Sequence, residues 1–136
     1  RMADLPARAA RAGAAIGLLG SGGPEAAATF DLVLADVPCS GSGAWRRAPE
    51  GKWTTGRARL AELAAVQAAI LDRAAALTAP GGALAYATCS LLATENEAQV
   101  AAFLARRTGF VREGGLRLTP LDGGDGFFLA ILRRFA

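Results

Sequence analysis

Two cysteines and one aspartate carry most of the reactive chemistry that this sequence offers. Cys39 lies in the segment DVPCSGSG (36–43), Cys89 lies in YATCSLLATENE (86–97), and a serine follows each of them. The sequence contains no histidine and no other cysteine. Serine–histidine triads, cysteine–histidine proteases, histidine metal sites and cysteine-rich zinc sites therefore cannot be built from this chain alone. A reactive thiol would need activation by backbone dipoles, arginine or its substrate.

Both cysteines come at the end of a predicted strand. The continuous apolar run DLVLAD (31–36) is typical of a strand buried on both faces of a parallel sheet. The run ALAYATCS (83–90) predicts a second such strand, and apolar residues at helical spacing predict a helix over 60–77 between them. Parallel strands end at one edge of the sheet, which is where ligands bind. We therefore expect Asp36 and the two cysteines to converge on one crevice.

The remaining segments predict further helices and strands. Pro80-Gly81-Gly82 is expected to end the central helix. Thr94 and Glu97 form a capping-box pattern, from which a helix would run to about Arg107. The other expected elements are a helix over 2–12 ended by Gly13, strands over 14–20, 109–113 and 126–135, and loops over 20–29 and 38–57. This alternation favours an α/β fold with a mostly parallel sheet.

The composition is that of one folded domain. Its 136 residues are 52% hydrophobic and 20% charged, which provides enough apolar surface for a packed core. No apolar run approaches the ~20 residues that a membrane helix needs, and two distant cysteines do not make a disulfide framework, so we expect a cytoplasmic protein without a membrane partner. The net charge of +3 permits a nucleic-acid partner but does not require one. The simplest interpretation of each cysteine is a small buried hydrophobe, but two at strand ends beside an acid favour a site.

Four segments, taken in order, resemble the motifs of a known enzyme family. They are FDLVLADVPCSGSG, RRAPEGKW, PGGALAYATCSLLATENE and DGFF. They are similar to successive motifs of the RNA 5-methylcytosine methyltransferases of the Nop/Sun family, and most of all to the bacterial enzymes that act on small-subunit ribosomal RNA. The resemblance runs from about Arg1 to Arg134, and the paired PCSG and TCS motifs around a PGG turn are its most specific part.

The resemblance implies transfer of a methyl group from S-adenosylmethionine to C5 of a cytosine in RNA, with no metal involved. Cys89 would attack C6 of the cytosine, and Cys39 would assist release of the product. Asp36 would bind the edge of the cytosine ring, and Asp36 and Pro38 would contribute to the cofactor site. Addition of a thiolate at C6 makes C5 nucleophilic, and an acid at N3 favours that addition. An unpaired cytosine of ribosomal or transfer RNA is the easier substrate, because the base must leave its stack.

The resemblance also implies a Rossmann-like class I methyltransferase fold, with strand order 3-2-1-4-5-7-6 and an antiparallel last strand. Residues 1–136 would be the C-terminal portion of the catalytic domain and would lack the first two strands. The glycine-rich loop and the ribose-binding acid that follow those strands are not found, since GSGG (20–23) follows the wrong strand. We therefore expect this chain alone to be inactive, with strand 31–36 exposing an edge that could pair two copies.

The long loop after Cys39 is the expected RNA contact. Arg46, Arg47, Lys52 and Trp53 could contact phosphates and stack on bases, although a solvated loop is the simpler interpretation.

Two alternative functions compete with the RNA enzyme. In a DNA cytosine C5 methyltransferase the Pro-Cys thiol is the nucleophile, so Cys39 would act and Cys89 would be incidental. A non-catalytic RNA-binding fragment or paralogue would keep the fold but would not bind the cofactor.

Overall fold

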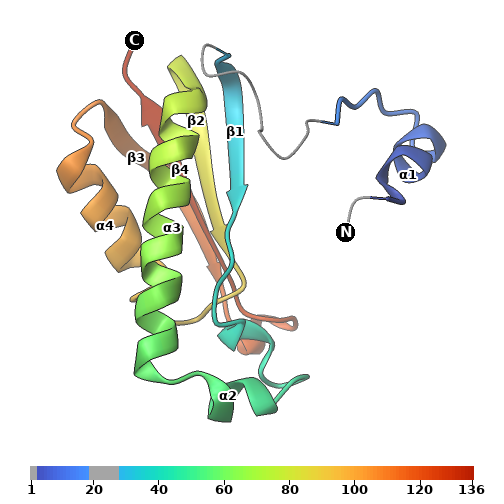
Figure 1. The fold of residues 1–136 in the computed structure, drawn as a ribbon, viewed down its shortest axis with the longest axis vertical. Coiled ribbons are helices and arrows are strands. Elements are labelled where there is room, and N and C mark those ends of the chain that lie inside the picture. The colour runs from blue at the N-terminus through green and yellow to red at the C-terminus, as the bar shows by residue number, and fades with distance from the viewer. Residues whose placement is uncertain (1–2, 19–27) are drawn as a thin grey trace.

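The computed structural model describes residues 3–18 and 28–136, which fold around a four-stranded sheet with two helices on one face (Figure 1). The described helices are α1 (Leu5–Arg11), α2 (Glu50–Thr54), α3 (Arg57–Leu77) and α4 (Glu97–Arg106), with 3-10 turns at Ser42–Ala44 and Pro120–Asp122. The strands are β1 (Phe30–Asp36), β2 (Thr78–Thr88), β3 (Phe110–Leu118) and β4 (Phe127–Arg134). Figure 1 shows α1 standing clear of the sheet, whereas α3 and α4 lie against it.

The strands are arranged in the order β1-β2-β4-β3. β1 and β2 are parallel, and β4 is antiparallel to both of its neighbours, β2 and β3. Three strands therefore run one way and the last strand of the chain runs the other. This confirms the predicted α/β fold with a mostly parallel sheet and an antiparallel last strand. In the class I numbering, the four strands form the 4-5-7-6 portion of the sheet.

The core lies between the sheet and the two long helices. Leu84 and Tyr86 of β2 are fully buried there with Leu71 of α3, Phe103 of α4 and Phe128 of β4. Tyr86 and Phe128 meet edge to face, with ring centroids 6.4 Å apart. The βαβ unit of β1, α3 and β2 is thus held by side chains from every layer, which fixes where β1 and β2 end.

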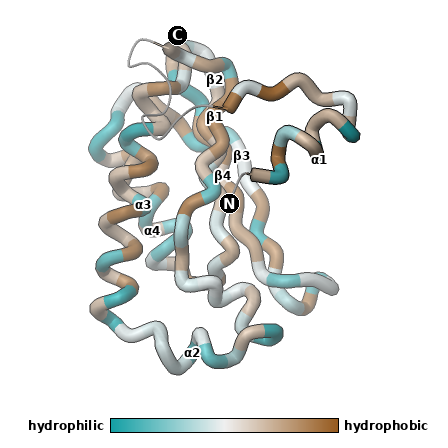
Figure 2. The backbone as a smooth tube through the Cα atoms, turned by 45° about the vertical axis from the view of Figure 1, so that its right-hand side comes forward, coloured by the Kyte–Doolittle hydropathy of each residue, from teal (hydrophilic) through white to brown (hydrophobic). Residues whose placement is uncertain are grey.

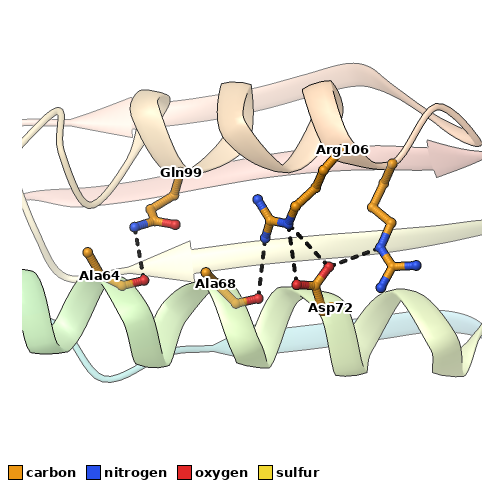
Figure 3. A network of polar contacts seen from close by, with 6 residues as sticks. Ala64, Ala68, Asp72, Gln99 and Arg106 are labelled. Carbon is orange, nitrogen blue, oxygen red and sulfur yellow. Dashed lines mark hydrogen bonds and ion pairs between the residues drawn. The ribbon is translucent and has the colours of Figure 1, made fainter.

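Polar contacts hold α4 against α3 (Figure 3). Nε of Arg106 donates to the Asp72 carboxylate at 3.3 Å, and Nε of Arg107 donates to it at 3.0 Å. Gln99 donates to the backbone carbonyl of Ala64 at 3.1 Å. Burial tends to raise the pKa of Asp72, but the two arginines outweigh it, so the pKa lies below its ordinary value.

One face of β1 is open, which corrects the prediction that strand 31–36 is buried on both faces. Val33 and Ala35 point to the core, but the side chains between them do not: Leu32 is 65% exposed and Leu34 is 66% exposed. The apolar run predicted the strand correctly. The double burial is wrong because α3 covers one face only, and within residues 3–18 and 28–136 no element covers the other.

The N-terminal segment differs from expectation in its strand. The helix expected over 2–12 is α1, and Gly13 follows its C-cap with φ +64°, as expected of a residue that ends a helix. Residues 14–18 form no strand, because no neighbouring strand pairs with them, and the end of the expected strand 14–20 lies outside the described residues. Most of the loop expected over 20–29 also lies outside them.

Three boundaries of the central region differ from expectation. The helix expected over 60–77 is α3, which ends at Leu77, so Pro80-Gly81-Gly82 lies inside β2 instead of ending the helix. The loop expected over 38–57 contains α2 and a 3-10 turn. Glycine and proline marked the irregular segments but did not reveal these short helical turns.

The start of α4 also differs from the predicted capping box. Asn96 is the N-cap residue and makes no side-chain capping bond, while Glu97 accepts a hydrogen bond from Arg117 of β3 at 2.6 Å. Glu97 therefore binds a side chain of another element and does not cap its own helix.

Hydrophobic and hydrophilic residues alternate along α3 and α4 (Figure 2). No helix in the described parts of the chain is long and apolar enough to cross a membrane.

Candidate functional site

The two cysteine thiols meet at the edge of the sheet where β1 and β2 end. Their sulfur atoms lie 3.3 Å apart, although fifty positions separate them in sequence. Pairing of the two strands continues past Asp36, because the Val37 amide donates to the Ala87 carbonyl at 3.1 Å. The register therefore brings the turn after β1 beside the turn after β2. The predicted convergence of the two cysteines is confirmed.

The two thiols have different surroundings. Cys39 is half-buried, and burial is the largest cause that raises the pKa of its thiol to about 12; a hydrogen bond with the backbone of Gly41 opposes the rise only in part. Cys89 is exposed. A pKa near 12 leaves Cys39 protonated at neutral pH, and the thiolate is the reactive form of a cysteine. Cys89 is the more accessible of the two thiols.

Asp36 and Pro38 lie at the same edge and are both exposed. Asp36 is the last residue of β1 and pairs in register with Ala87, two residues before Cys89. The carbonyl of Pro38 accepts a hydrogen bond from Gln67 of α3 at 3.0 Å, which fixes the backbone immediately before Cys39. Asp36 is therefore open to solvent at the end of β1, whereas the backbone of Pro38 is tied to α3.

A buried carboxylate that the sequence analysis missed lies behind the thiols. Glu95 is 1% exposed and accepts hydrogen bonds from the amide of Ser40 at 2.8 Å, the hydroxyl of Ser40 at 2.6 Å, Gln67 at 3.1 Å and the hydroxyl of Ser90. Ser40 follows Cys39 and Ser90 follows Cys89. The serine after each cysteine was the only sequence signal for this network.

Further hydrogen bonds join the two cysteine turns directly. The hydroxyls of Ser42 and Ser90 lie 3.0 Å apart, and the Leu91 amide donates to the Ser42 hydroxyl at 2.8 Å. The Gly43 amide donates to the carbonyl of Cys89 at 3.0 Å. The turns are therefore one hydrogen-bonded unit, not two loops that happen to be near each other.

The DGFF segment closes this unit from the third side. The Gly126 amide donates to the Gly43 carbonyl at 2.9 Å, and a Cβ at Gly43 would lie 2.1 Å from the Gly126 carbonyl oxygen. Asp125 accepts a bidentate hydrogen bond from Arg47, which lowers its pKa, and lies 3.9 Å from the guanidinium of Arg46. Both arginines expected to contact RNA are thus anchored beside the cysteine turns.

The other two residues expected to contact RNA lie on α2. Trp53 is 82% exposed, and the ammonium group of Lys52 lies 5.5 Å from the centre of its ring. Trp45 in contrast turns inward, where its indole nitrogen is buried against Gly51. An exposed indole beside a cation offers a stacking surface, while Trp45 holds the loop in place.

A hollow of about 280 Å³ lies beside α3, where it is lined by Arg57, Leu60, Ala61, Ala64 and Thr94, and neither cysteine lines it. Within residues 3–18 and 28–136, no group of three or more acidic or cysteine side chains could hold a metal ion. Cys89 itself is exposed, so its thiol can be approached from solvent.

Sequence comparisons identify close relatives. Residues 19–133 match the family described as 16S rRNA methyltransferase RsmB/F. The ribosomal RNA small subunit methyltransferase B of Erwinia tasmaniensis is 45% identical over 111 residues, and that of Klebsiella pneumoniae is 46% identical over 111 residues. Each match covers 76% of this chain but 26% of the relative, so the chain spans about a quarter of the length of these proteins.

Solved structures agree with the fold. The crystal structure of PH0851 matches with a TM-score of 0.73 and 34% identity, over 76% of this chain and 26% of that one. NSun6 from Pyrococcus horikoshii, solved with SFG, matches with a TM-score of 0.81 over 100% of this chain and 39% of that one; at 24% identity it supports the fold alone. With a family match that extends over most of its length, this chain belongs to the 16S rRNA methyltransferase RsmB/F family.

Proposed function

We propose that the protein carrying this chain transfers a methyl group from S-adenosylmethionine to C5 of a cytosine in small-subunit ribosomal RNA, in the cytoplasm. The observation that carries the proposal is the pair of thiols 3.3 Å apart at the ligand-binding edge of the sheet. Family membership supports ribosomal RNA as the substrate. Because the chain spans about a quarter of its relatives, the activity is assigned to the protein at its natural length.

The difference between the thiols supports Cys89 as the nucleophile. A nucleophilic cysteine must be reachable and must give up its proton. Cys89 is exposed, whereas burial keeps the pKa of Cys39 near 12. This argues against the DNA-enzyme alternative, in which Cys39 would attack first. A protonated Cys39 next to Cys89 is instead suited to the later step in which the product leaves.

The reaction proceeds by addition and elimination on the base. The sulfur of Cys89 forms a bond to C6 of the cytosine, which makes C5 nucleophilic enough to accept a methyl group. Asp36 lies open at the same edge, where its carboxyl group can hold the N3 edge of the ring and support the charge that develops there. The C5 proton is lost to solvent, the Cys89–C6 bond breaks to restore the aromatic ring, and the protonated Cys39 thiol assists by donating a hydrogen bond to the Cys89 thiolate that leaves.

The exposed edge also fits one side of a cofactor site. Asp36 and Pro38 are both exposed there. Bound S-adenosylmethionine supplies the electrophilic methyl group. The role of these two residues is to border it on the side of the cytosine.

Arg46, Arg47, Lys52 and Trp53 form the proposed RNA contact. Trp53 and Lys52 present an indole and a cation to solvent on α2, a combination that binds a base and a phosphate. Arg47 is held in place by its ion pair with Asp125, and Arg46 lies beside it; both side chains are mostly exposed, so both guanidinium groups can reach a phosphate.

Covalent trapping tests the proposal. The natural-length protein would be incubated with small-subunit ribosomal RNA and S-adenosylmethionine, and adducts would be separated on denaturing gels. We expect Cys39→Ala to accumulate a protein–RNA adduct, because release is impaired, and Cys89→Ala to form none. The reverse pattern would favour a DNA-enzyme mechanism. No adduct and no cofactor binding in any variant would favour a non-catalytic RNA-binding protein.

A further inference from the structure

We propose that Glu95 is a positioning residue whose buried carboxylate sets the distance between the Cys39 and Cys89 thiols. The claim about thiol placement stands on the geometry alone. Its consequence for methyl transfer rests on the function proposed above. Glu95 lies between β2 and α4 and touches neither sulfur in any hydrogen bond among the described residues, so it would act through the serines that follow the cysteines.

The hydrogen bonds of Glu95 divide evenly between its two oxygens. Oε1 accepts from the backbone amide of Ser40 at 2.8 Å and from Nε2 of Gln67 at 3.1 Å. Oε2 accepts from the hydroxyl of Ser40 at 2.6 Å and from the hydroxyl of Ser90. Four donors use the four lone-pair positions that an ionised carboxylate offers. Only an acceptor without hydrogens of its own can bind all four.

The order of donors around the serines follows from this arrangement. Ser90 has one hydroxyl hydrogen and gives it to Glu95, so the hydroxyl of Ser42, 3.0 Å away, must donate to Ser90. The Leu91 amide in turn donates to Ser42, and the Leu92 amide donates to Ser90 at 3.0 Å. In this series each group donates toward Glu95, and the Glu95 carboxylate is the final acceptor.

The network binds both cysteine turns within one residue of their thiols. Ser40 is adjacent to Cys39, and Ser90 is adjacent to Cys89, so a shift of either serine moves a sulfur. Gln67 adds a link from Glu95 to the Pro38 carbonyl on the other side of Cys39. Because Glu95 is 1% exposed, water cannot take over these hydrogen bonds at little cost.

Replacing the carboxylate by an amide is the sharpest change. In Glu95→Gln the amide nitrogen presents two hydrogens to groups that are donors in the wild type. The Ser40 amide cannot reverse, and the serine hydroxyls can accept only by giving up their own bond to residue 95. The variant keeps the size of the side chain but loosens at least one cysteine turn.

Thiol–disulfide exchange measures the placement without any methyl transfer. Oxidised glutathione reacts with the two thiols to give the Cys39–Cys89 disulfide and two molecules of reduced glutathione. The equilibrium constant reports how closely the thiols are held, and mass mapping of the linked peptides identifies the bond. We expect Glu95→Gln to lower this constant about tenfold, the factor that corresponds to losing one hydrogen bond to a charged group.

Glu113→Gln is the matched control. Glu113 is a carboxylate of β3 that pairs with Arg133 of β4 at the surface of the sheet. The thiol–disulfide equilibrium constant of this control should stay within about twofold of the wild-type constant. A wild-type or raised constant in Glu95→Gln would overturn the proposal. So would a fall in the thermal unfolding midpoint with no change in the constant of the folded protein, since that marks a merely structural role.

Two further variants keep the test decisive if Glu95→Gln fails to fold. Ser40→Ala and Ser90→Ala each remove one donor to Glu95 beside one thiol, and each should lower the constant in the same direction. An unchanged constant in both would contradict the proposal. Failure of Cys39→Ala to trap an RNA adduct would remove the proposed function but leave the thiol equilibrium as it is. If Cys39→Ala traps the RNA adduct as expected but Glu95→Gln leaves the thiol–disulfide equilibrium constant unchanged, this inference fails and the proposed function stands.

Discussion

Burial keeps the Cys39 thiol protonated, and this thiol lies directly beside the thiol of Cys89. Cys39 is half-buried with a raised pKa and its sulfur lies 3.3 Å from that of exposed Cys89. A protonated thiol can donate a hydrogen bond to a neighbouring sulfur, whereas two thiolates this close would repel each other. The pair therefore combines one half-buried, protonated thiol with one thiol that is exposed to solvent.

We expect alkylation to distinguish the two thiols by pH. The thiolate is the form that reacts with iodoacetamide, and a raised pKa means that little thiolate is present. At pH 8 Cys39 should react more slowly than a cysteine in the unfolded chain, by a factor of roughly a thousand for a pKa near 12. Its rate should go on rising with pH toward about 12, which peptide mass spectrometry can follow.

The control for that experiment is the same protein in urea. Unfolding removes the burial that raises the pKa, so Cys39 and Cys89 should then react at similar rates. A Cys39 rate in the folded protein that levels off near pH 9 would show that burial does not protect this thiol.

Topology explains why the sequence predicted where the two cysteines meet but not the group behind them. Both cysteines follow apolar strands, and parallel strands must end at the same edge, so the meeting of the two thiols could be expected. Glu95 sits four positions before the first buried residue of α4 and looks like an ordinary exposed acid. Its burial arises only when both cysteine turns fold over it, which no local pattern expresses.

At the scale of elements, close backbone contact holds the three turns of the site together. The 3-10 turn at Ser42–Ala44 meets the DGFF segment so closely that only glycine fits at Gly43 and Gly126. We expect Gly43→Ala to lower the free energy of unfolding by about 1–3 kcal/mol, the range of an overpacked contact, because its Cβ would lie 2.1 Å from a carbonyl oxygen. Denaturant titration would measure the loss.

Gly124→Ala is the comparison for that change. Gly124 is two residues from Gly126, and a Cβ there would meet nothing within 4 Å. Its stability should stay within about 0.5 kcal/mol of the wild type, as at other free surface positions. Equal losses in Gly43→Ala and Gly124→Ala would show that the close contact at Gly43 does not determine the effect.

The contact between α3 and α4 gives a prediction with a defined pH dependence. Arg106 and Arg107 lower the pKa of Asp72, so its ion pairs stabilise the fold above the ordinary carboxyl pKa of 3.8 and lose that effect as the pH falls through the lower folded value. Asp72→Asn should cost less than about 1 kcal/mol at pH 7, because the pair is partly exposed, and should cost less at pH 2 than at pH 7.

Glu62→Gln provides a reference on the same helix. Glu62 pairs with Arg59 on the exposed surface of α3, away from α4, and should contribute less than Asp72 does. Chemical denaturation of both variants at pH 7 and pH 2 gives the comparison. A loss in Asp72→Asn that is the same at both pH values would show that packing, and not charge, is the cause.

Long elements with one buried face were predictable, whereas their environment was not. β1, α3, β2, β3 and β4 follow from apolar runs or helical spacing, because each element contributes to one core, whereas α4 was expected from a capping-box pattern. Residues 14–18 have an equally apolar sequence but no partner strand, and Leu32 and Leu34 have no covering layer. An apolar run favours burial of its side chains, but whether they are buried depends on the neighbouring elements.

At the scale of the whole molecule, the sheet is open in two directions. β1 is an edge strand, so its outer row of amides and carbonyls has no partner strand within residues 3–18 and 28–136. The face of the sheet away from α3 exposes Leu32 and Leu34 of the same strand. Parallel sheets of this kind are usually covered on both faces, and an apolar edge of this kind tends to pair with another strand.

We therefore expect the 136-residue chain, expressed alone, to self-associate through β1, and we expect one charge on the open face to prevent it. Leu34→Lys should shift size exclusion with light scattering toward a monomer without loss of stability, because Leu34 is 66% exposed. Val33→Lys, one residue away on the core side, should instead unfold the chain. Backbone amides of β1 should exchange slowly in the associated wild type and rapidly in Leu34→Lys. A wild-type chain that is a monodisperse monomer with rapidly exchanging β1 amides would contradict this, because it would mean that an apolar open edge is stable in water without a partner.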